Sequence, residues 1–502
     1  MLLLGIDIGT SSIKVSIVDA DTQQSIASTI YPEVETEIIS IKPGWAEQDP
    51  EVWWHNVQQA ILKLHNSGTY QASNIVAIGI AYQMHGLVMV DGNQNVLRNS
   101  IIWCDSRSID IGKTAFEKIG SQKCVTHLLN SPGNFTASKL AWVKHNEPEV
   151  YAKAHKIMLP GDFIAMKLTG EITTSIAALS EGIFWDFKNN QLSKDIFDYY
   201  GFDTALIPTI KNVFEEHGKL TKLIAEKLCL PVGIPVTYKA GDQPNNAFSL
   251  NVLQPGQVAA NAGTSGVIYA VNNVLAYDKQ LRVNSFAHVN YLASTYGSNN
   301  KTVSNNIVNM GILLCINGTG ILNRWIKNIA SKALTYQQIN EAASKISIGS
   351  NGLQIFPFGN GAERMLGNKI IGACIQNIDL NIHTNAHLFR AAQEGIAFAF
   401  RYGMDIMKEN GLQPNIIRAG KSNMFLSSVF TKSFVNVLNM PVQLYNVDGS
   451  VGAAIGAGLG AKVYKNEQEA FQYFKPIITI EPAQITMYDE LYLNWKNKLE
   501  SQ

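Results

Sequence analysis

The sequence lacks paired cysteines and an excess of charge of either sign. Its 502 residues contain 40 lysines and arginines against 40 aspartates and glutamates, which gives a formal net charge of +0. Without a basic stripe, we expect neither nucleic acid nor an anionic membrane surface as a partner. The cysteines are scattered and form no CxxC pair, which argues against a disulfide framework or a zinc site. They are Cys104, Cys124, Cys229, Cys315 and Cys374.

Long apolar runs and leader-like segments are also missing. The chain opens with a methionine and three leucines and passes directly into Gly5 and Asp7, with no basic stretch before them. This apolar run is too short for a signal peptide, and no later stretch is long enough to span a bilayer. We therefore expect a cytoplasmic protein. Its 46% hydrophobic content is ample for large cores.

The sequence does contain a duplicated strand–turn–strand pattern. Residues 4–17 read LGIDIGTSSIKVSI, and residues 258–271 read VAANAGTSGVIYAV. Each copy has an apolar strand, a glycine turn with two hydroxyl residues, and a second strand. Such a turn presents backbone N–H groups and hydroxyls to one point, which suits a phosphate. Two copies predict two related halves that hold one polyphosphate between them.

Hydrophobic periodicity around the hairpins predicts an α/β protein. One helix should begin with Asp49 as its cap and Pro50 in its first position, and Gly68 should stand just after its end. Helical patterns dominate the later part of the chain, and one of them covers residues 385–407. Further strands are expected at 75–81, 87–90, 99–103 and 234–238.

The duplication favours two large domains, although length alone would suggest about three. No low-complexity linker divides them. The boundary is expected between Pro244 and Pro255, and we place the domains at residues 1–246 and 247–502. A run of small residues at 449–458 would let the start of a helix pack closely against another backbone or a ligand.

Two aspartates follow apolar strands at positions that suit phosphoryl transfer. Asp7 stands just before the first glycine turn, where a carboxylate is well placed to hold hydrated Mg²⁺ against phosphates. Asp242 follows a strand and a glycine, where a carboxylate can take the proton of an attacking hydroxyl. The alternatives are a turn residue that satisfies local donors for Asp7, and a helix N-cap for Asp242. The repeat of the turn favours the functional interpretation of Asp7.

Other polar residues stand where predicted strands end. Open α/β sheets bind ligands at the carboxyl ends of their strands, so Gln83 and His85 fit the recognition of hydroxyl groups. The alternative is a histidine satisfied inside the core. Asp105 and Arg107 follow the strand expected at 99–103, and the alternative for them is a surface ion pair of little energetic weight.

These motifs also keep a fixed order along the chain. The order runs Gly5 to Ser11, Gln83 to Gly86, Trp103 to Arg107, Gly241-Asp242, Gly263 to Ser265, Glu363-Arg364, Glu394-Gly395 and Gly452 to Ala454. It resembles that of the FGGY carbohydrate kinases, within the actin/hexokinase/Hsp70 superfamily. The similarity extends from Gly5 to the region of Tyr488 and Tyr492. Within the family, the Gln83 to Gly86 stretch is most similar to the xylulokinases.

The resemblance implies two ribonuclease-H-like domains around a deep cleft, and a phosphotransferase with an alcohol group as acceptor. ATP and Mg²⁺ would convert D-xylulose to D-xylulose 5-phosphate, a step of D-xylose catabolism, and a homodimer would be compatible with the family. Asp242 would be the catalytic base, and Asp7 would hold the metal through water. The sugar site would comprise Gln83, Met84, His85, Asp105 and Gln243. The ATP site would comprise Gly9, Thr10, Ser11, Gly263, Thr264, Ser265, Ala419, Gly420 and Gly452.

Three departures from the family pattern leave alternatives open. The adenosine-side stretch, usually rich in glycine, reads Arg418 to Asn423, and residues 174–177 lack an expected carboxylate. Gln243 follows the base where xylulokinases usually have asparagine, which resembles glycerol kinases. One alternative is therefore a kinase for ribulose, glycerol or gluconate. The other is a non-catalytic ATP-binding switch of the same superfamily, although a switch needs no polyol pocket.

Overall fold

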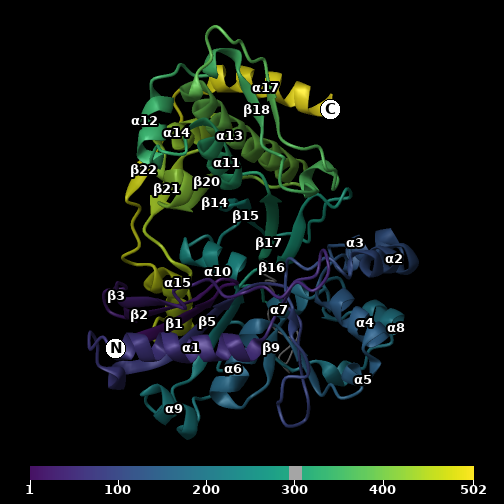
Figure 1. Cartoon of the computed structure of the whole chain (residues 1–502). Helices are drawn as coiled ribbons and strands as arrows, with labels where there is room; N and C mark the ends of the chain where they lie inside the picture. The colour runs from purple at the N-terminus through teal and green to yellow at the C-terminus, as the bar shows by residue number, and fades with distance from the viewer. Residues whose placement is uncertain (293–307, 502) are drawn as a thin grey trace.

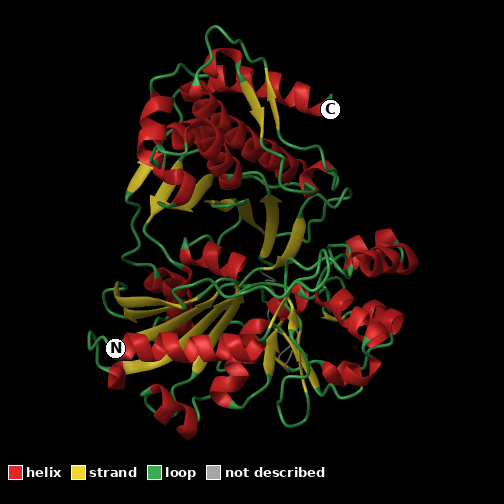
Figure 2. Ribbon diagram, in the orientation of Figure 1, coloured by secondary structure: helices red, strands yellow, loops and turns green. Residues whose placement is uncertain are grey.

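The computed structural model describes residues 1–292 and 308–501 as an α/β protein built on two large sheets. The sheet of the N-terminal segment lies in the lower part of Figure 1, and the second sheet lies above it. Figure 2 shows the strands of both sheets toward the middle of the molecule, with most helices outside them. The fold therefore confirms the α/β class.

The lower sheet has five strands in the order β13-β5-β1-β2-β3. β1 pairs antiparallel with β2, and β2 pairs antiparallel with β3. On the other side, β5 lies parallel to β1, and β13 lies parallel to β5. The strands are β1 Leu2–Ile8, β2 Ile13–Asp19, β3 Ser25–Tyr31, β5 Ile75–Tyr82 and β13 Val236–Gly241.

The upper sheet repeats this arrangement within seven strands, in the order β16-β17-β15-β14-β20-β21-β22. β14, β15 and β17 are antiparallel neighbours, while β20 and β21 continue parallel to β14. The five-strand pattern therefore occurs twice, as the ribonuclease-H-like expectation requires. The strands are β14 Gln257–Ala262, β15 Gly266–Asn272, β16 Asn284–Ala287, β17 Met310–Ile316, β20 Ile416–Gly420, β21 Val442–Tyr445 and β22 Ile478–Ile480.

Short strands and helices complete the described chain. The short strands are β4 Glu47–Gln48, β6 Val88–Val90, β7 Ser100–Ile101, β8 Lys156–Met158, β9 Thr173–Ser175, β10 Trp185–Asp186, β11 Gln191–Leu192, β12 Thr209–Lys211, β18 Gln354–Phe356 and β19 Cys374–Gln376. The α-helices are α1 Pro50–His65, α2 Ile109–Ile119, α3 Ser121–His127, α4 Thr136–Asn146, α5 Pro148–Tyr151, α6 Pro160–Thr169, α7 Ile176–Glu181, α8 Lys194–Tyr200, α9 Lys222–Leu228, α10 Asp242–Ser249, α11 Gly320–Ser331, α12 Tyr336–Ser344, α13 Asn385–Glu409, α14 Ser428–Leu438, α15 Gly449–Gly460, α16 Glu467–Ala470 and α17 Ile485–Glu500. Single 3₁₀ turns are η1 Ala72–Asn74, η2 Thr204–Leu206, η3 Ser350–Gly352, η4 Arg364–Leu366 and η5 Asn423–Leu426.

The start of α1 follows the sequence prediction. Asp49 caps it, because its side chain accepts a hydrogen bond from the Glu51 amide, and Pro50 takes the first helical position. The predicted end is late by one residue. Asn66 is the C-cap of the helix, so Gly68, with a φ of +66°, lies in the loop beyond the first residue after the cap.

The predicted strands differ mainly at their ends. β5 runs one residue further than expected, and β13 lies at 236–241 instead of 234–238. The expected strand at 99–103 shrinks to β7 Ser100–Ile101. The later chain is also less helical than expected, because β17 and its partner β16 close one edge of the upper sheet.

Helix α15 joins the second half of the chain to the first sheet. A Cβ placed on Gly5 would lie 1.8 Å from the Ser450 carbonyl oxygen, and one on Gly79 would lie 1.9 Å from that of Ala453. Glycine is therefore required wherever β1 and β5 touch this helix. The division at 246/247 falls within α10, and it stays a prediction.

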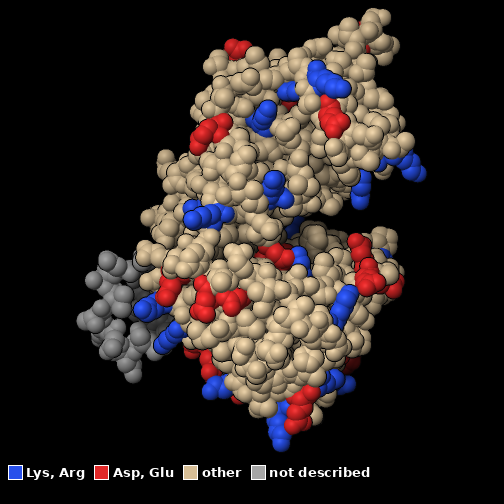
Figure 3. Space-filling view, turned by 90° about the vertical axis from the view of Figure 1, so that its left-hand side faces the viewer, with Lys and Arg blue, Asp and Glu red and all other residues tan. Residues whose placement is uncertain are grey.

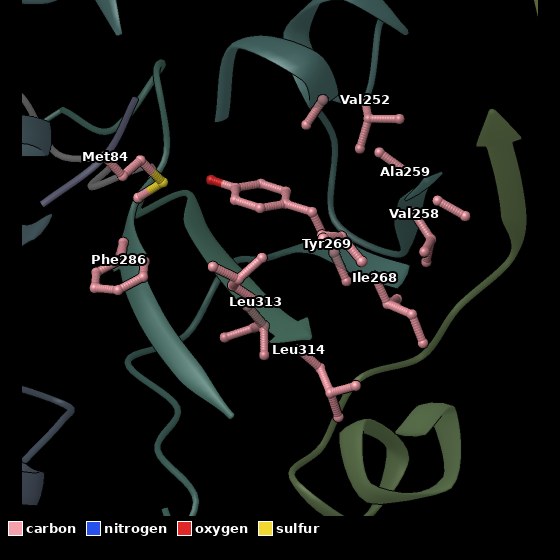
Figure 4. Packing of buried hydrophobic residues seen from close by; sticks show 14 of the residues in the cluster. Met84, Val252, Val258, Ala259, Ile268, Tyr269, Phe286, Leu313 and Leu314 are labelled. Atoms are coloured by element: carbon pink, nitrogen blue, oxygen red, sulfur yellow. The ribbon is translucent and has the colours of Figure 1, made fainter. Parts of the chain in front are cut away.

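Two groups of buried apolar side chains form the core. One includes Leu4, Ile6 and Trp53 on the β1–α1 side of the lower sheet. The other continues from the lower sheet into the upper one, and Figure 4 shows Met84 facing the hydroxyl of Tyr269 within it. In residues 1–292 and 308–501, no helix has the length and apolar character needed to traverse a bilayer.

Candidate active site

Asp242 lies where the lower sheet meets helix α10. It is the first residue of α10, directly after the end of β13, and Gly241 takes the N-cap position. The structural alternative of an N-cap aspartate is therefore wrong. Burial raises the pKa of the Asp242 carboxyl to about 6, although hydrogen bonds from Gln243 lower it in part. A carboxylate with such a pKa can serve as a general base near neutral pH.

Asp7 lies in β1 beside a group of charges. It pairs in register with Lys14 of β2, and the Lys14 ammonium forms an ion pair with Asp448, the N-cap of α15. Burial, together with the negative charges of Asp242 and Asp448, raises the pKa of Asp7 to about 7, while Lys14 lowers it. This side of the site therefore carries an excess of carboxyl groups that a cation would relieve.

The strand-end residues after β5 lie next to these carboxyl groups. Met84 is buried, and a Cβ placed on Gly241 would lie 2.7 Å from its Cγ. The His85 Nδ1 donates to the carbonyl oxygen of Glu181 at 3.0 Å, because a carbonyl can only accept. Burial lowers the pKa of His85 to about 3. The neutral ring therefore keeps Nε2 as an acceptor for a hydroxyl donor.

Two aromatic rings and a lysine hold His85. Its ring contacts Phe135 at 4.9 Å and Phe286 at 5.5 Å between centroids, and Lys139 donates to its carbonyl oxygen at 2.9 Å. His85 is partly buried and has a φ of +62°. The alternative of a histidine satisfied inside the core is therefore only partly correct. Core side chains pack against the ring, but the core does not enclose it.

Asp105 and Arg107 form a buried ion pair, so the surface alternative for them is wrong. The carboxylate accepts bonds from Arg107 at 2.7 to 3.0 Å and from the Ala46 amide at 2.6 Å. The guanidinium also donates to Glu47 and lies 3.8 Å from the Trp45 ring centroid. Both oxygens of Asp105 are thus already engaged by the protein, unlike the exposed part of the Asp242 carboxyl.

The first glycine turn is tied to Gln83 and Trp103. The Thr10 hydroxyl donates to Gln83 Oε1 at 3.2 Å and accepts from Trp103 Nε1 at 2.9 Å. The Gln48 amide donates to the Thr10 carbonyl oxygen at 2.8 Å, and the Gly9 amide to the Ser12 carbonyl oxygen at 3.1 Å. Ser11 is exposed, so its hydroxyl faces outward from the turn.

The second glycine turn is tied to the start of helix α11. The Gly320 amide donates to the Gly263 carbonyl oxygen at 2.9 Å, and the Ile321 amide donates to that of Thr264 at 3.0 Å. The turn borders a cavity of about 400 Å³. This cavity is lined by Ala262, Gly263, Thr264, Gly320, Ile321, Asn323, Arg324, Tyr336, Asn340, Asn423, Met424, Leu426 and Ser427. The sequence analysis missed the α11 and α12 residues, which have no motif of their own.

The remaining predicted nucleotide residues separate into two places. Ala419 and Gly420 end β20, next to η5 and its Asn423, which lines the same cavity. Gly452 lies elsewhere: a Cβ on it would lie 1.7 Å from Ser249 Oγ, and it lines a different cavity of about 380 Å³. The small-residue run is therefore explained by close packing of α15 on α10 and on strands β1, β5 and β13, and the cavity that Gly452 lines includes neither glycine turn.

Gln243 and a further carboxyl complete the surroundings of Asp242. Gln243 is partly buried, and its Oε1 has no hydrogen-bond partner among the described residues. Glu181, at the end of α7, is 1% exposed and also lacks a partner for either carboxyl oxygen within the described chain. No sequence motif pointed to Glu181. Figure 3 shows a hollow between the upper and lower parts of the molecule on one face.

The duplicated sheets and their paired turns define a fold of the actin/hexokinase type, and three comparisons show which proteins with this fold the chain is similar to. Residues 2–249 match the model of the FGGY family of carbohydrate kinases, N-terminal domain. The xylulose kinase of Haemophilus influenzae is 28% identical over 93% of this chain and 92% of its own length. That of Bacillus subtilis is 27% identical over 99% of this chain and 96% of its own.

Solved structures share the whole fold. The xylulose kinase from Rhodospirillum rubrum superposes with a TM-score of 0.85 at 23% identity, covering 100% of this chain and 99% of that one. The glycerol kinase of Plasmodium falciparum, solved with ADP, gives 0.87 at 18% identity, covering 100% and 98%. Residues 2–249 are thus an N-terminal domain of the FGGY family of carbohydrate kinases, and the chain is similar to xylulose kinases over nearly its whole length. It is a phosphotransferase with an alcohol group as acceptor.

Proposed function

We propose that the protein transfers the γ-phosphoryl group of ATP to D-xylulose and forms D-xylulose 5-phosphate. The observation that carries the proposal is the position of Asp242. Its carboxyl lies at the end of β13 with a pKa raised by burial to about 6, next to Met84 and close to the charge of Asp7. The names of the full-length relatives supply the sugar.

Asp242 takes the proton of the attacking sugar hydroxyl. Removal of a general base typically costs 10²–10⁴-fold in rate, and most of the remaining catalysis comes from positioning and charge neutralisation. His85 accepts a hydrogen bond from a second hydroxyl through Nε2, while Met84 packs against the carbon chain of the sugar. Gln83, Gln243 and Asp105 support this side of the site.

ATP lies between the two glycine turns. The backbone amides of Thr10, Ser11, Thr264 and Ser265 bind its phosphates, and the cavity beside Gly263 takes the adenosine. That cavity, at about 400 Å³, has the size of a small-molecule site. Asn340 and Asn423 on its wall offer amide groups to a base. They can replace contacts that a glycine-rich stretch after β20 would provide.

The residues present fit a magnesium ion that is held mainly by phosphates. Asp7 is the residue that would hold it through water, because burial and the neighbouring carboxyl groups raise its pKa and a cation would offset their negative charge. In the described part of the chain, no cluster of three or more His, Cys, Asp or Glu side chains could bind a metal by itself. Mg²⁺ commonly keeps several waters and takes one or two carboxylates plus substrate phosphates. When bound, it would neutralise charge on the phosphates.

Closure of residues 1–246 on residues 247–502 would complete the site. A site open to water would hydrolyse ATP, so sugar binding should drive the closure that brings hydroxyl, phosphate and Asp242 together. We expect sugar plus nucleotide to lower the radius of gyration in solution scattering. An unchanged radius at saturating ligands would argue against this closure.

A sugar acid is the less supported acceptor. An acid would need a guanidinium near His85. Arg107 is committed to Asp105 and Glu47, but the charge of Arg364 acts on His85, and no ion pair of Arg364 is found among the described residues. The preference for an uncharged sugar therefore rests on the names of the relatives. A coupled ADP-release assay with xylulose, ribulose, glycerol and gluconate tests the proposal directly. We expect the highest kcat/KM with D-xylulose. A higher kcat/KM with another acceptor would make that acceptor the substrate in place of D-xylulose. ATP binding without phosphoryl transfer to any of the four would favour a non-catalytic ATP-binding switch.

A further inference from the structure

Glu181 is a buried carboxyl group placed directly behind the corner that carries the catalytic base. It is the last residue of α7 and is 1% exposed. A Cβ placed on Gly241 would lie 2.6 Å from Glu181 Oε1 and 2.7 Å from Met84 Cγ. Its main-chain carbonyl accepts the hydrogen bond that orients His85. One residue thus contacts both the support of the base and the hydroxyl-binding histidine.

The Glu181 carboxyl has no cation to pair with. No ion pair involving it is found within residues 1–292 and 308–501, and neither oxygen makes a hydrogen bond of normal geometry there. The nearby cation Lys239 is already bound to Asp162 at 2.5 Å and to the Thr173 carbonyl oxygen. The charged or titratable groups that face Glu181 are Asp242 of α10, Asp162 of α6, Tyr82 of β5 and Tyr269 of β15.

These surroundings oppose a negative charge on Glu181. An ionised carboxylate buried without a partner costs several kcal/mol, so such a group usually binds a proton instead. Burial, followed by the charges of Asp242 and Asp162, raises the pKa of Glu181 well above its usual value, against smaller opposing effects of the Gly241 amide and the Tyr82 hydroxyl. Asp242, which is partly exposed, loses its proton first.

We propose that Glu181 is a positioning residue of the active site, an uncharged acid that supports the Gly241–Asp242 corner and leaves the negative charge of this pair on Asp242. The catalytic part of this inference rests on the proposed kinase function, whereas the uncharged state does not. Such a pair resembles other sites in which two neighbouring carboxyls are pushed to different protonation states. Polar character at position 181, without charge, is what the reaction needs.

Thermal unfolding without substrate tests the uncharged state. A carboxyl whose folded pKa is raised contributes stability that is present below its unfolded pKa and is lost as pH rises toward the folded one. Glu181→Gln should therefore unfold at the same temperature as the wild type at pH 4, below the unfolded pKa of a glutamate, and about 2 °C or more above it at pH 8. The raised pKa values of Asp242 and Asp7 are common to both proteins and cancel in this difference.

Glu394 offers the matched control. It is also buried, but it accepts hydrogen bonds from Arg390 at 2.7 Å, the Ser350 hydroxyl at 3.0 Å and the Gly349 amide at 3.1 Å. Glu394→Gln should lower the unfolding temperature at both pH values, because it leaves Arg390 buried without its acid. If Glu181→Gln were destabilised at pH 8 in the same way as Glu394→Gln, Glu181 would be a paired anion and the proposal would be overturned.

Kinetics with the best acceptor tests the positioning role. Glu181→Met keeps the length of the side chain but removes its polar end, so kcat should fall about 10-fold with an unchanged KM for ATP. Glu181→Gln should restore kcat to within about 3-fold of wild type. It should also leave the acid limb of the pH profile near 6, because it changes no charge beside Asp242.

Two kinetic outcomes would overturn the positioning role. One is full kcat in Glu181→Met, and the other is an acid limb that drops by about one pH unit in Glu181→Gln, which would mean that a charge had been removed. If the wild type phosphorylated no acceptor, the proposed function would fail instead. The unfolding comparison would then still decide the uncharged state of Glu181.

Discussion

The two glycine turns share one backbone pattern but differ in every charged neighbour. Asp7 precedes the first turn by two residues, and Asn261 holds the same position before the second. Across the hairpin, Asp7 pairs with Lys14, whereas Asn261 pairs with Val267. In the proposed mechanism, the duplicated frame supplies two phosphate-binding loops, while base and metal chemistry lie on the first side alone.

The hydrogen bonds of the two glycine turns also differ. The Thr10 hydroxyl is joined to Gln83 and Trp103 on the polyol side, while the carbonyl groups of Gly263 and Thr264 receive the first amides of α11 beside the large cavity. We therefore propose that the first turn is coupled to the acceptor and the second to the nucleotide. Substitutions matched between the two turns can separate these tasks.

The largest effect is expected at Asp242. Asp242→Asn should lower kcat by about 10²–10⁴-fold, because the sugar hydroxyl loses its proton acceptor. In the wild type, turnover should fall as pH drops through about 6, where protonation removes the base. Steady-state ADP release measures both. A variant that kept more than about a tenth of wild-type turnover would exclude Asp242 as the base.

The next effect tests the unequal charges of the two turns. Asp7→Asn should lower Mg²⁺-dependent turnover by about 10–100-fold and raise the Mg²⁺ concentration needed for half-maximal rate. Asn261→Ala, at the matching position, should change both by less than about 3-fold. Equal losses in the two variants would mean that the second turn also carries metal chemistry.

A smaller effect is expected from displacing the second turn. A Cβ placed on Gly320 would lie 2.4 Å from the Gly263 carbonyl oxygen, so Gly320→Ala must move the turn. We expect the KM for ATP to rise about 10-fold, with the KM for the sugar unchanged. Gly92→Ala, at a glycine without a positive φ and with no atom within 4 Å of the added Cβ, is a control for alanine substitution outside the turn.

The smallest expected effect comes from the threonine hydroxyls. Thr10→Val removes the hydrogen bonds to Gln83 and Trp103, and the KM for the sugar should rise about 3–10-fold. Thr264→Val should instead change the KM for ATP by a similar factor. If both variants raised the KM for the same substrate, the two turns would not serve different substrates.

Local patterns could predict much of this frame. The alternation of apolar residues indicated both hairpins, the Asp49-Pro50 cap indicated the start of α1, and the apolar stripe at 385–407 indicated α13. These features depend on neighbours in sequence. The rule that ligands bind at the carboxyl ends of parallel strands indicated Gln83 and His85, whereas Met84 followed only from the family resemblance.

Long-range packing explains what the sequence could not reveal. Asp105 is buried because Trp45 and Glu47 cover its partner Arg107. Position 452 requires glycine because Ser249 of helix α10 lies against it. The cavity beside Gly263 takes its walls from α11 and α12, which carry no motif. Glu181 is the last residue of the short helix α7, which carries no motif, and its carboxyl faces Asp242.

The most direct test of the division between the turns is a calorimetric titration of nucleotide into Asp242→Asn and Gly320→Ala, with turnover measured on the same samples. The account predicts that Asp242→Asn binds nucleotide like the wild type and turns over about 10²–10⁴-fold more slowly. Gly320→Ala should bind it about 10-fold more weakly and approach wild-type kcat at saturation. If both variants lost the same property, the two turns would not have separate tasks.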